Sequence, residues 1–300
     1  MDAWILLSIA AAAFQTLRFV LQKRLSMGTL SAGGATLARF LYSAPFVVVL
    51  AGGYLVATSA AWPGMTPAFL AYAVAGGLSQ ILATWAVIAL FAERNFAVGI
   101  TFKKTEVVQT ALVGLVVLGD RVGLAGFGAI LLGLAGVLLL SQTPGTAERW
   151  WRRLGTRAAL LGLGSGALFA VSAVGYRGAT LEIASADPLM RAGITLAAVT
   201  LMQTAALALW LAWREPGQLG RVVAARRVAV WIGLSGMAGS LCWFTAFTLQ
   251  SAAMVFAVGQ VEVIFSLLAS ALIFGERLTR REGLGIALVT VSVIAVAALR

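Results

Sequence analysis

The chain has 300 residues, of which 61% are hydrophobic and only 11% are charged. Soluble domains carry about 25% charged residues, so this composition indicates a membrane protein and leaves no room for a soluble domain. The net charge of +11 is interpreted as loop arginines that fix orientation, not as a nucleic-acid surface. Histidine is absent and the single cysteine, Cys242, lies in an apolar run, which excludes disulfides, zinc sites and Cys/His nucleophiles.

Ten apolar runs follow one another along the chain, separated by short polar or Gly/Pro stretches. A helix needs about 20 mostly apolar residues to span a membrane. We therefore predict an all-α polytopic membrane protein with ten transmembrane helices. The runs cover residues 3–22, 33–56, 68–91, 96–118, 123–141, 157–178, 188–213, 228–249, 253–274 and 283–299.

The sequence divides into two related halves, residues 1–145 and 157–300, joined by a basic linker at 146–156. An offset of 156 carries Gly119-Asp120-Arg121 onto Gly275-Glu276-Arg277 and carries Glu106 onto Glu262. A glutamate repeated inside an apolar span is a stronger signal than a charge pair at a span end. Because each half has five spans, an odd number, two copies must lie in opposite orientations, which predicts two inverted five-helix repeats.

Basic residues gather on one side of the predicted membrane protein. Since cytoplasmic loops are enriched in Lys and Arg, this side is predicted to be cytoplasmic and both termini to be non-cytoplasmic. The basic side holds Lys23, Arg24, Arg94, Arg149, Arg152, Arg153, Arg157, Arg214, Arg221, Arg226, Arg227, Arg277, Arg280 and Arg281. The other side holds Arg121, Arg177 and Arg300.

The end of the second half resembles an EamA-type repeat of the drug/metabolite transporter superfamily. The resemblance rests on Glu262-Val263-Ile264-Phe265, an apolar helix, Gly275-Glu276-Arg277-Leu278-Thr279 and a glycine-rich last span. The first half repeats this pattern more loosely, and Arg39 resembles an arginine often found in the second helix of that family. The resemblance implies a ten-helix bundle that moves small metabolites such as amino acids, often coupled to protons or to exchange.

The chain departs from the family pattern in two respects. Val107 and Val263 stand where the family usually has proline after the glutamate, so the sequence does not predict a proline-induced helix break there. Family members usually have both termini in the cytoplasm, opposite to the orientation that the arginines predict.

Charged residues inside the spans are the candidate substrate-binding residues, since each costs about 2.5–3.5 kcal/mol to insert and is retained when it faces a cavity or a partner. They are Arg18, Arg39, Lys103, Lys104, Glu106 and Glu262. On a helix, Lys103, Glu106 and Gln109 form one polar stripe, from which Lys104 points away. One interpretation makes Lys103–Glu106 a self-neutralising packing pair. The other places Glu106 and Glu262 across a pseudo-two-fold axis, where they bind an ammonium group or a coupling proton.

Trp85 and Trp243 are further candidates for a cavity wall or a cation–π surface, although packing or anchoring at the membrane interface is the commoner role of a tryptophan in such a run. Tyr42 and Gln80 are weaker candidates of the same kind. Arg177 and Arg191 lie nearer the span ends, where they can snorkel towards water.

The resulting prediction is a secondary transporter of small polar, anion-bearing or amino-acid-like metabolites in the inner membrane. Two positive charges in excess within the spans favour a substrate with an anionic group. We expect no enzymatic activity, no cofactor, no metal and no nucleic-acid partner. The expected partners are a small solute, the lipid bilayer and a candidate coupling proton, in a monomer or homodimer. The alternatives are a flippase for a lipid-linked anion and a membrane-embedded lipid-modifying enzyme.

Overall fold

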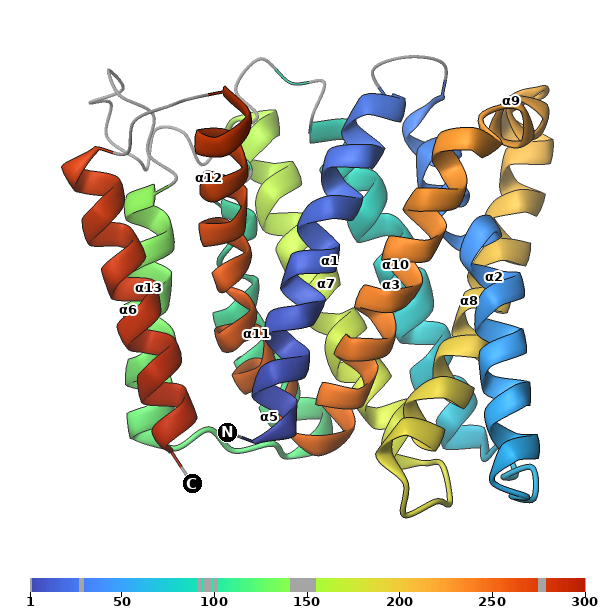
Figure 1. The fold of residues 1–300 in the computed structure, drawn as a ribbon, viewed down its shortest axis with the longest axis horizontal. Coiled ribbons are helices and arrows are strands. Elements are labelled where there is room, and N and C mark those ends of the chain that lie inside the picture. Colours follow the sequence, from blue (N-terminus) through green and yellow to red (C-terminus); the bar gives the residue numbers. More distant parts are fainter. Residues whose placement is uncertain are drawn as a thin grey trace.

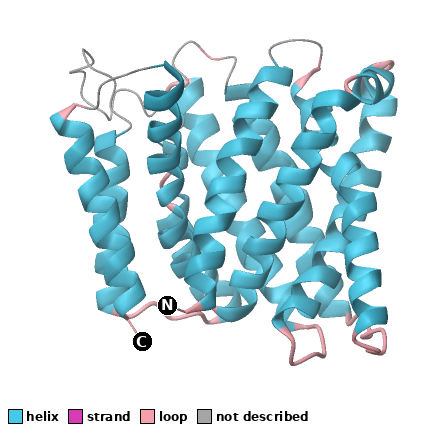
Figure 2. Cartoon of the chain, viewed as in Figure 1, coloured by secondary structure: helices cyan, strands magenta, loops and turns pink. Residues whose placement is uncertain are grey.

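The computed structural model describes residues 2–26, 30–90, 93, 99, 102–140, 155–274 and 279–299. Within these residues the chain forms helices and no strand, as the composition predicted (Figure 2). The helices are α1 (Ala3–Ser26), α2 (Ala32–Ala57), α3 (Pro67–Leu90), α5 (Glu106–Leu118), α6 (Leu124–Leu140), α7 (Arg157–Leu181), α8 (Pro188–Arg214), α9 (Gln218–Ala224), α10 (Arg226–Leu249), α11 (Ala252–Gly259), α12 (Val261–Phe274) and α13 (Arg280–Ala298). Gly275-Glu276-Arg277 and residues 146–154 of the predicted linker lie outside the described residues.

Most described residues of the ten predicted runs fall on helices, with some differences from expectation. The ninth run holds two helices, α11 and α12, and the short α9 follows α8 without an apolar run to predict it. Among the described residues, seven helices are long and apolar enough to cross a membrane: Ala3–Gln22, Ala32–Ala57, Pro67–Leu90, Arg157–Leu181, Pro188–Arg214, Arg226–Leu249 and Arg280–Ala298. Three apolar segments, Glu106–Leu118, Leu124–Leu140 and Ala252–Phe265, are shorter. The chain is therefore a multi-pass membrane protein, while the count of ten spans stays a prediction.

The helices run up and down between two ends of the bundle (Figure 1). Both termini lie at one end, which we call the terminal end, and α9 lies at the other, the α9 end. The loops 58–66, 119–123, 182–187 and 250–251 connect helices at the terminal end.

The distribution of side chains is that of a protein surrounded by lipid. Large apolar side chains face outward, with Val116 84% and Leu124 94% exposed, whereas Arg18 and Lys103 are only 2% and 3% exposed. In lipid an apolar exterior costs nothing, and charged groups must turn inward to find partners. The polar interior is therefore the place to look for a functional site.

The most extensive helix contacts join the first half of the chain to the second. Helix α3 packs on α7, α1 on α10, α6 on α13 and α2 on α8. Glycines permit the close approach, since a Cβ atom at Gly175 of α7 would lie 2.9 Å from the Cα of Gly76 of α3. Likewise, a Cβ at Gly136 of α6 would lie 2.9 Å from the carbonyl oxygen of Gly285 of α13. Small residues at such interfaces are the usual means of helix association in membranes.

Polar residues at the span boundaries set several helix starts. The side chains of Ser31 and Thr156 accept hydrogen bonds from Gly34 and Ala159 at the starts of α2 and α7. Thr279 and Glu282 form a reciprocal capping box at the start of α13.

Candidate functional site

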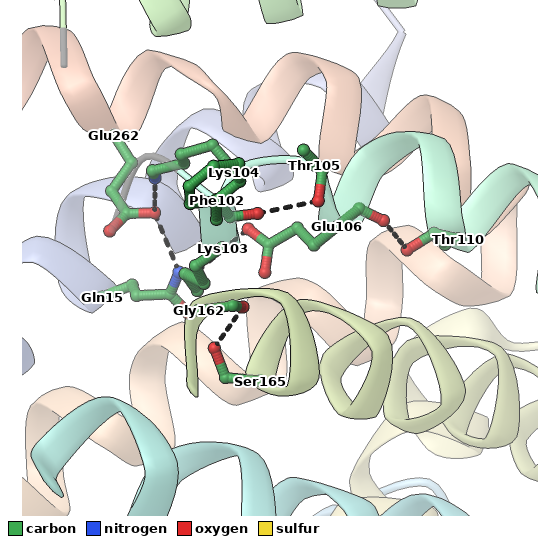
Figure 3. Close-up of polar contacts among 10 residues, drawn as sticks. All are labelled: Gln15, Phe102, Lys103, Lys104, Thr105, Glu106, Thr110, Gly162, Ser165 and Glu262. Atoms are coloured by element: carbon green, nitrogen blue, oxygen red, sulfur yellow. Dashed lines mark hydrogen bonds and ion pairs between the residues drawn. The ribbon is translucent and has the colours of Figure 1, made fainter. Parts of the chain in front are cut away.

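The fourth predicted span is interrupted just before Glu106. Phe102 and Lys103 are helical, Lys104 and Thr105 form a turn, and α5 starts at Glu106. The Thr105 hydroxyl donates to the carbonyl of Phe102 at 2.7 Å and the Thr105 amide donates to the same oxygen at 3.2 Å (Figure 3). In a continuous helix that carbonyl would accept from the amide of Glu106, so Thr105 offers a local alternative to the helical bond.

The ninth predicted span is interrupted at the equivalent place. Helix α11 ends at Gly259, Gln260 forms a turn, and α12 starts at Val261 with Glu262 in its first turn. The offset of 156 carries Lys104 of the first break onto Gln260 of the second. Both breaks occur without the proline that the family pattern would supply. Each glutamate thus lies at the electropositive start of a half-helix, which favours a negative charge.

Two buried ion pairs occupy the space between the breaks (Figure 3). Lys103 Nζ lies 2.9 Å from Glu106 Oε1 within the first half. Lys104 Nζ lies 3.1 Å from Glu262 Oε2, so this pair joins the two halves. Gln15 of α1 also donates to Glu262 Oε2 at 3.1 Å. The side chains of all four paired residues are at most 12% exposed, so both pairs are shielded from solvent.

These charges line a pocket, which we call the carboxylate pocket. It is lined by Gln15, Lys103, Lys104, Glu106, Phe169, Trp243, Phe256, Gly259, Gln260 and Glu262. Lys103 Nζ lies 4.9 Å from the centroid of the Phe169 ring, a cation–π distance. Both side-chain polar atoms of Gln260 are buried without a hydrogen-bond partner in the described structure. The pocket therefore holds charges of both signs, aromatic rings and an amide with unused donors and acceptors.

Of the predicted polar stripe Lys103, Glu106 and Gln109, only the first two residues line this pocket. Lys103 and Glu106 line it, but Gln109 lies one turn further along α5, where its amide donates to Thr105 Oγ1 at 3.1 Å. A Cβ atom at Gly166 of α7 would lie 3.0 Å from Gln109 Oε1, so this side chain faces α7. Lys104, predicted to need an environment of its own, finds it at Glu262.

The two tryptophan candidates separate. Trp243 lines the carboxylate pocket and stacks on Phe247 with ring centroids 5.9 Å apart. Trp85 instead packs edge-on against Trp210 of α8, with centroids 4.6 Å apart, away from the lining of the pocket. Trp85 thus lies in a packing contact between α3 and α8, whereas Trp243 lies in the wall of the carboxylate pocket.

The two arginine candidates lie in a second location, between α1, α2 and α10. Arg18 is bonded to Gln22 and Arg39 to Ser240. Arg39 lines a separate pocket, the arginine pocket, together with Phe40, Ser43, Gln80, Leu196, Thr200, Gln203, Gly236, Met237, Ser240 and Phe244. Ser240 and Trp243 stand three residues apart on α10, so the two pockets adjoin along that helix.

Sequence reasoning missed Gln15, although a signal for it was present. Gln15, Arg18 and Gln22 recur at a spacing that puts them on one face of α1, inside an otherwise apolar run. Phe169 and Phe256 gave no such signal, because nothing distinguishes a pocket aromatic from a packing aromatic by sequence alone.

Comparisons with known proteins agree with this architecture. Residues 156–298 match the model of the EamA-like transporter family, which confirms over that segment the resemblance predicted from the motifs. The matched segment is therefore similar to a family of membrane transporters. A solved structure described only as "Crystal structure of protein" is 16% identical, with a TM-score of 0.68 over 97% of this chain and 95% of that chain. It shows that the fold is shared over nearly the full length. No curated protein sequence matches this one.

Proposed function

We propose that this chain, whose residues 156–298 match the EamA-like transporter family, is a secondary transporter of small polar metabolites in the cell's inner membrane. The solutes would be amino-acid-like or otherwise anion-bearing, and they would move by alternating access coupled to protons or to exchange. The observation that carries the proposal is the Lys104–Glu262 ion pair, which joins the two halves where their broken helices meet.

The proposed inverted repeat is supported by how the helices pair. If α1 corresponds to α7, α2 to α8, α3 to α10 and α6 to α13, the contact of α3 with α7 corresponds to that of α1 with α10. The contacts of α2 with α8 and of α6 with α13 then each correspond to themselves. A pseudo-two-fold axis in the membrane plane produces this pattern. Such an axis gives the molecule two arrangements of similar energy, open to opposite sides.

The carboxylate pocket suggests how a solute would be recognised. Glu106 and Glu262 are each paired with a lysine, and a solute ammonium group would compete with those lysines for the same oxygens. A proton that neutralises Glu262 would also weaken its attraction to Lys104. Either event loosens a contact between the halves, which is what a conformational change between two access states requires.

A transport assay in sealed proteoliposomes tests the proposal. Amino acids, organic acids, polyamines and sugar phosphates would be screened with and without a pH gradient. We expect uptake of at least one amino-acid-like or anionic solute, and loss of that uptake in Glu106→Gln and in Glu262→Gln. The matched control is Glu182→Gln, which changes the same side chain in the loop 182–187, away from the pocket.

Three results would contradict the proposal. Normal uptake by both glutamine variants, inserted at the level of the wild type, would show that the central carboxylates are dispensable. Activity that persists in detergent without a sealed barrier would show chemistry instead of transport. Transport of plain cations alone would contradict the proposal that the solute is amino-acid-like or anion-bearing.

A further inference from the structure

The buried charges of the molecule do not compensate one another evenly. The two lysines of the carboxylate pocket each bind one glutamate, so that pocket is electrically balanced. Among the described residues, Arg18 and Arg39 form no ion pair with any carboxylate, although they are only 2% and 5% exposed. The two positive charges that the spans carry in excess are therefore these two guanidinium groups.

The two arginines lie close together, one from α1 and one from α2. A Cβ atom at Gly236 of α10 would lie 3.1 Å from Arg39 Cγ and 3.3 Å from Arg18 Cδ, so both side chains pass over the same glycine. Arg18 donates a hydrogen bond to the side-chain oxygen of Gln22 at 2.5 Å, and the side-chain nitrogen of Gln22 donates to the carbonyl of Ala35. Glu262 forms its ion pair with Lys104, at 3.1 Å.

Arg39 is the less satisfied of the two. One of its terminal nitrogens, Nη2, donates to Ser240 at 3.1 Å, whereas Nη1 is buried and has no hydrogen-bond partner among the described residues. A buried guanidinium with an unused donor is costly, because desolvation is not repaid by a partner. The cost is offset when a ligand supplies the missing acceptor.

The pocket in front of Arg39 offers further donors and no competing acid. Its polar lining apart from Arg39 consists of Ser43, Gln80, Thr200, Gln203 and Ser240, all of them neutral. The carbonyl of Gln80 accepts from Tyr176 at 2.8 Å and from Gln203 at 3.0 Å. This pattern fixes the amide so that its nitrogen, which has no hydrogen bond in the described structure, remains a free donor.

We propose that the arginine pocket is an oxyanion-binding site, which takes the carboxylate or phosphate group of the transported solute through Arg39, Ser240 and Gln80. Guanidinium groups bind both oxyanions with paired hydrogen bonds, and Arg18 adds a second positive charge beside the site. The inference deepens the proposed transport function, on which its physiological meaning rests. It also assigns the two groups of the solute to two adjoining pockets: the carboxylate pocket binds an ammonium group and the arginine pocket binds an oxyanion.

The test measures binding and needs no transport. Purified protein in detergent would be heated in sodium phosphate, sodium acetate or sodium succinate, each against sodium chloride at the same ionic strength. A ligand that binds only the folded protein raises the melting temperature. We expect phosphate or a carboxylate to raise it in the wild type, the two anion classes being told apart by which salt acts. In Arg39→Gln the rise should be lost, and in Arg39→Lys it should be smaller than in the wild type.

The behaviour of the ligand-free variant separates a binding arginine from a structural one. Removing a buried charge that has no acidic partner should leave the melting temperature of Arg39→Gln in chloride equal to or above that of the wild type. A clear fall would mean that Arg39 holds the fold together, and this would overturn the proposal. Arg226→Gln at the α9 end is the control, and it should keep the full response to the anion.

Failure of this inference is distinct from failure of the transport proposal. If no oxyanion stabilises the wild type beyond chloride, or if Arg39→Gln responds like the wild type, the site is refuted even when uptake depends on Glu106 and Glu262. If the oxyanion binds through Arg39 but no solute crosses a sealed membrane, the site stands and the transport function falls.

Discussion

At the level of single residues, helical spacing predicted one of the two buried ion pairs and could not predict the other. The spacing of Lys103 and Glu106 predicted their contact, since residues three apart share a helix face. The same geometry separated Lys104 from that face but could not say that Glu262 receives it. That partner is 158 positions away along the chain and is brought close only by the packing of the two halves.

The Lys104–Glu262 pair can be tested as a structural or a functional element. Lys104→Gln removes the ammonium partner of a buried carboxylate and should lower the unfolding free energy by about 3–5 kcal/mol. The double variant Lys104→Gln/Glu262→Gln leaves no isolated charge and should recover most of that loss in thermal unfolding in detergent. Transport should remain absent in both variants. Uptake restored together with stability would mean that the pair only supports packing.

Arg177 was expected to snorkel towards water, and its bonds are different. It binds Asp120 with two hydrogen bonds of 2.7 and 3.2 Å, and it also donates to the carbonyls of Phe247 and Gln250 at 2.6 and 2.7 Å. Sequence offered no means of finding these carbonyl partners, because backbone acceptors have no signature. The residue ties α7, the loop 119–123 and the end of α10 together at the terminal end.

Loss of this cluster should loosen the terminal end of the bundle. Arg177→Gln removes both bonds to Asp120 and both to backbone carbonyls, and we expect the unfolding free energy to fall by roughly 2–4 kcal/mol. Arg177→Lys should recover little, since an ammonium group lacks the planar geometry that reaches all four acceptor atoms at once. The measurement is thermal unfolding in detergent. Full rescue by lysine would show that charge alone matters at this position.

At the level of helices, the sequence predicted where the spans lie better than it predicted where a span is broken into two helices. Apolar length located the spans, because the membrane imposes about 20 residues on every crossing helix. The breaks before Glu106 and Glu262 were not predicted, because neither contains proline and a threonine or glutamine inside an apolar run is no strong signal. Thr105 acts through a hydrogen bond from its hydroxyl to the carbonyl of Phe102, which depends on the rotamer and not on residue type alone.

Glycines of α7 provide a matched test of helix packing. A Cβ atom at Gly162 would collide with the carbonyl of Gly99, whereas one at Gly164 meets nothing within 4 Å. Gly162→Ala should therefore destabilise the protein by about 1–3 kcal/mol through overpacking. Gly164→Ala should be neutral or stabilising by up to roughly 1 kcal/mol, because alanine loses less conformational freedom in a helix. Equal melting temperatures for the two variants would contradict the predicted contact.

At the level of the whole molecule, the arrangement of charge at the two ends predicts orientation. The basic residues at helix ends of the α9 end include Arg157, Arg214, Arg226 and Arg280, while Arg177 at the terminal end is neutralised by Asp120. By the bias of basic loops towards the cytoplasm, we predict that the α9 end is cytoplasmic and that both termini are not. This is opposite to the usual arrangement in the family that the motifs resemble.

Reporter fusions settle this orientation. A reporter fused after Arg300, or inserted at Gly64 in the loop 58–66, should be active only on the non-cytoplasmic side. A reporter inserted at Gly220 in α9 should be active only in the cytoplasm. Cytoplasmic activity at Arg300 together with non-cytoplasmic activity at Gly220 would reverse the assignment. The two internal sites are chosen because a side chain added at either glycine meets no neighbouring atom within 4 Å.

The packing of the early helices on the late ones also has a consequence for how the protein is made. The main partners of α1, α2 and α3 are α10, α8 and α7, all of which are synthesised after residue 156. When the first 145 residues have entered the bilayer, Arg18 and Arg39 still lack the helix that carries Gly236 and Ser240. We therefore expect the nascent first half to lack part of the packing around these two guanidinium groups until α10 has been synthesised. Premature termination anywhere before α10 should accordingly yield a chain destined for quality-control proteolysis.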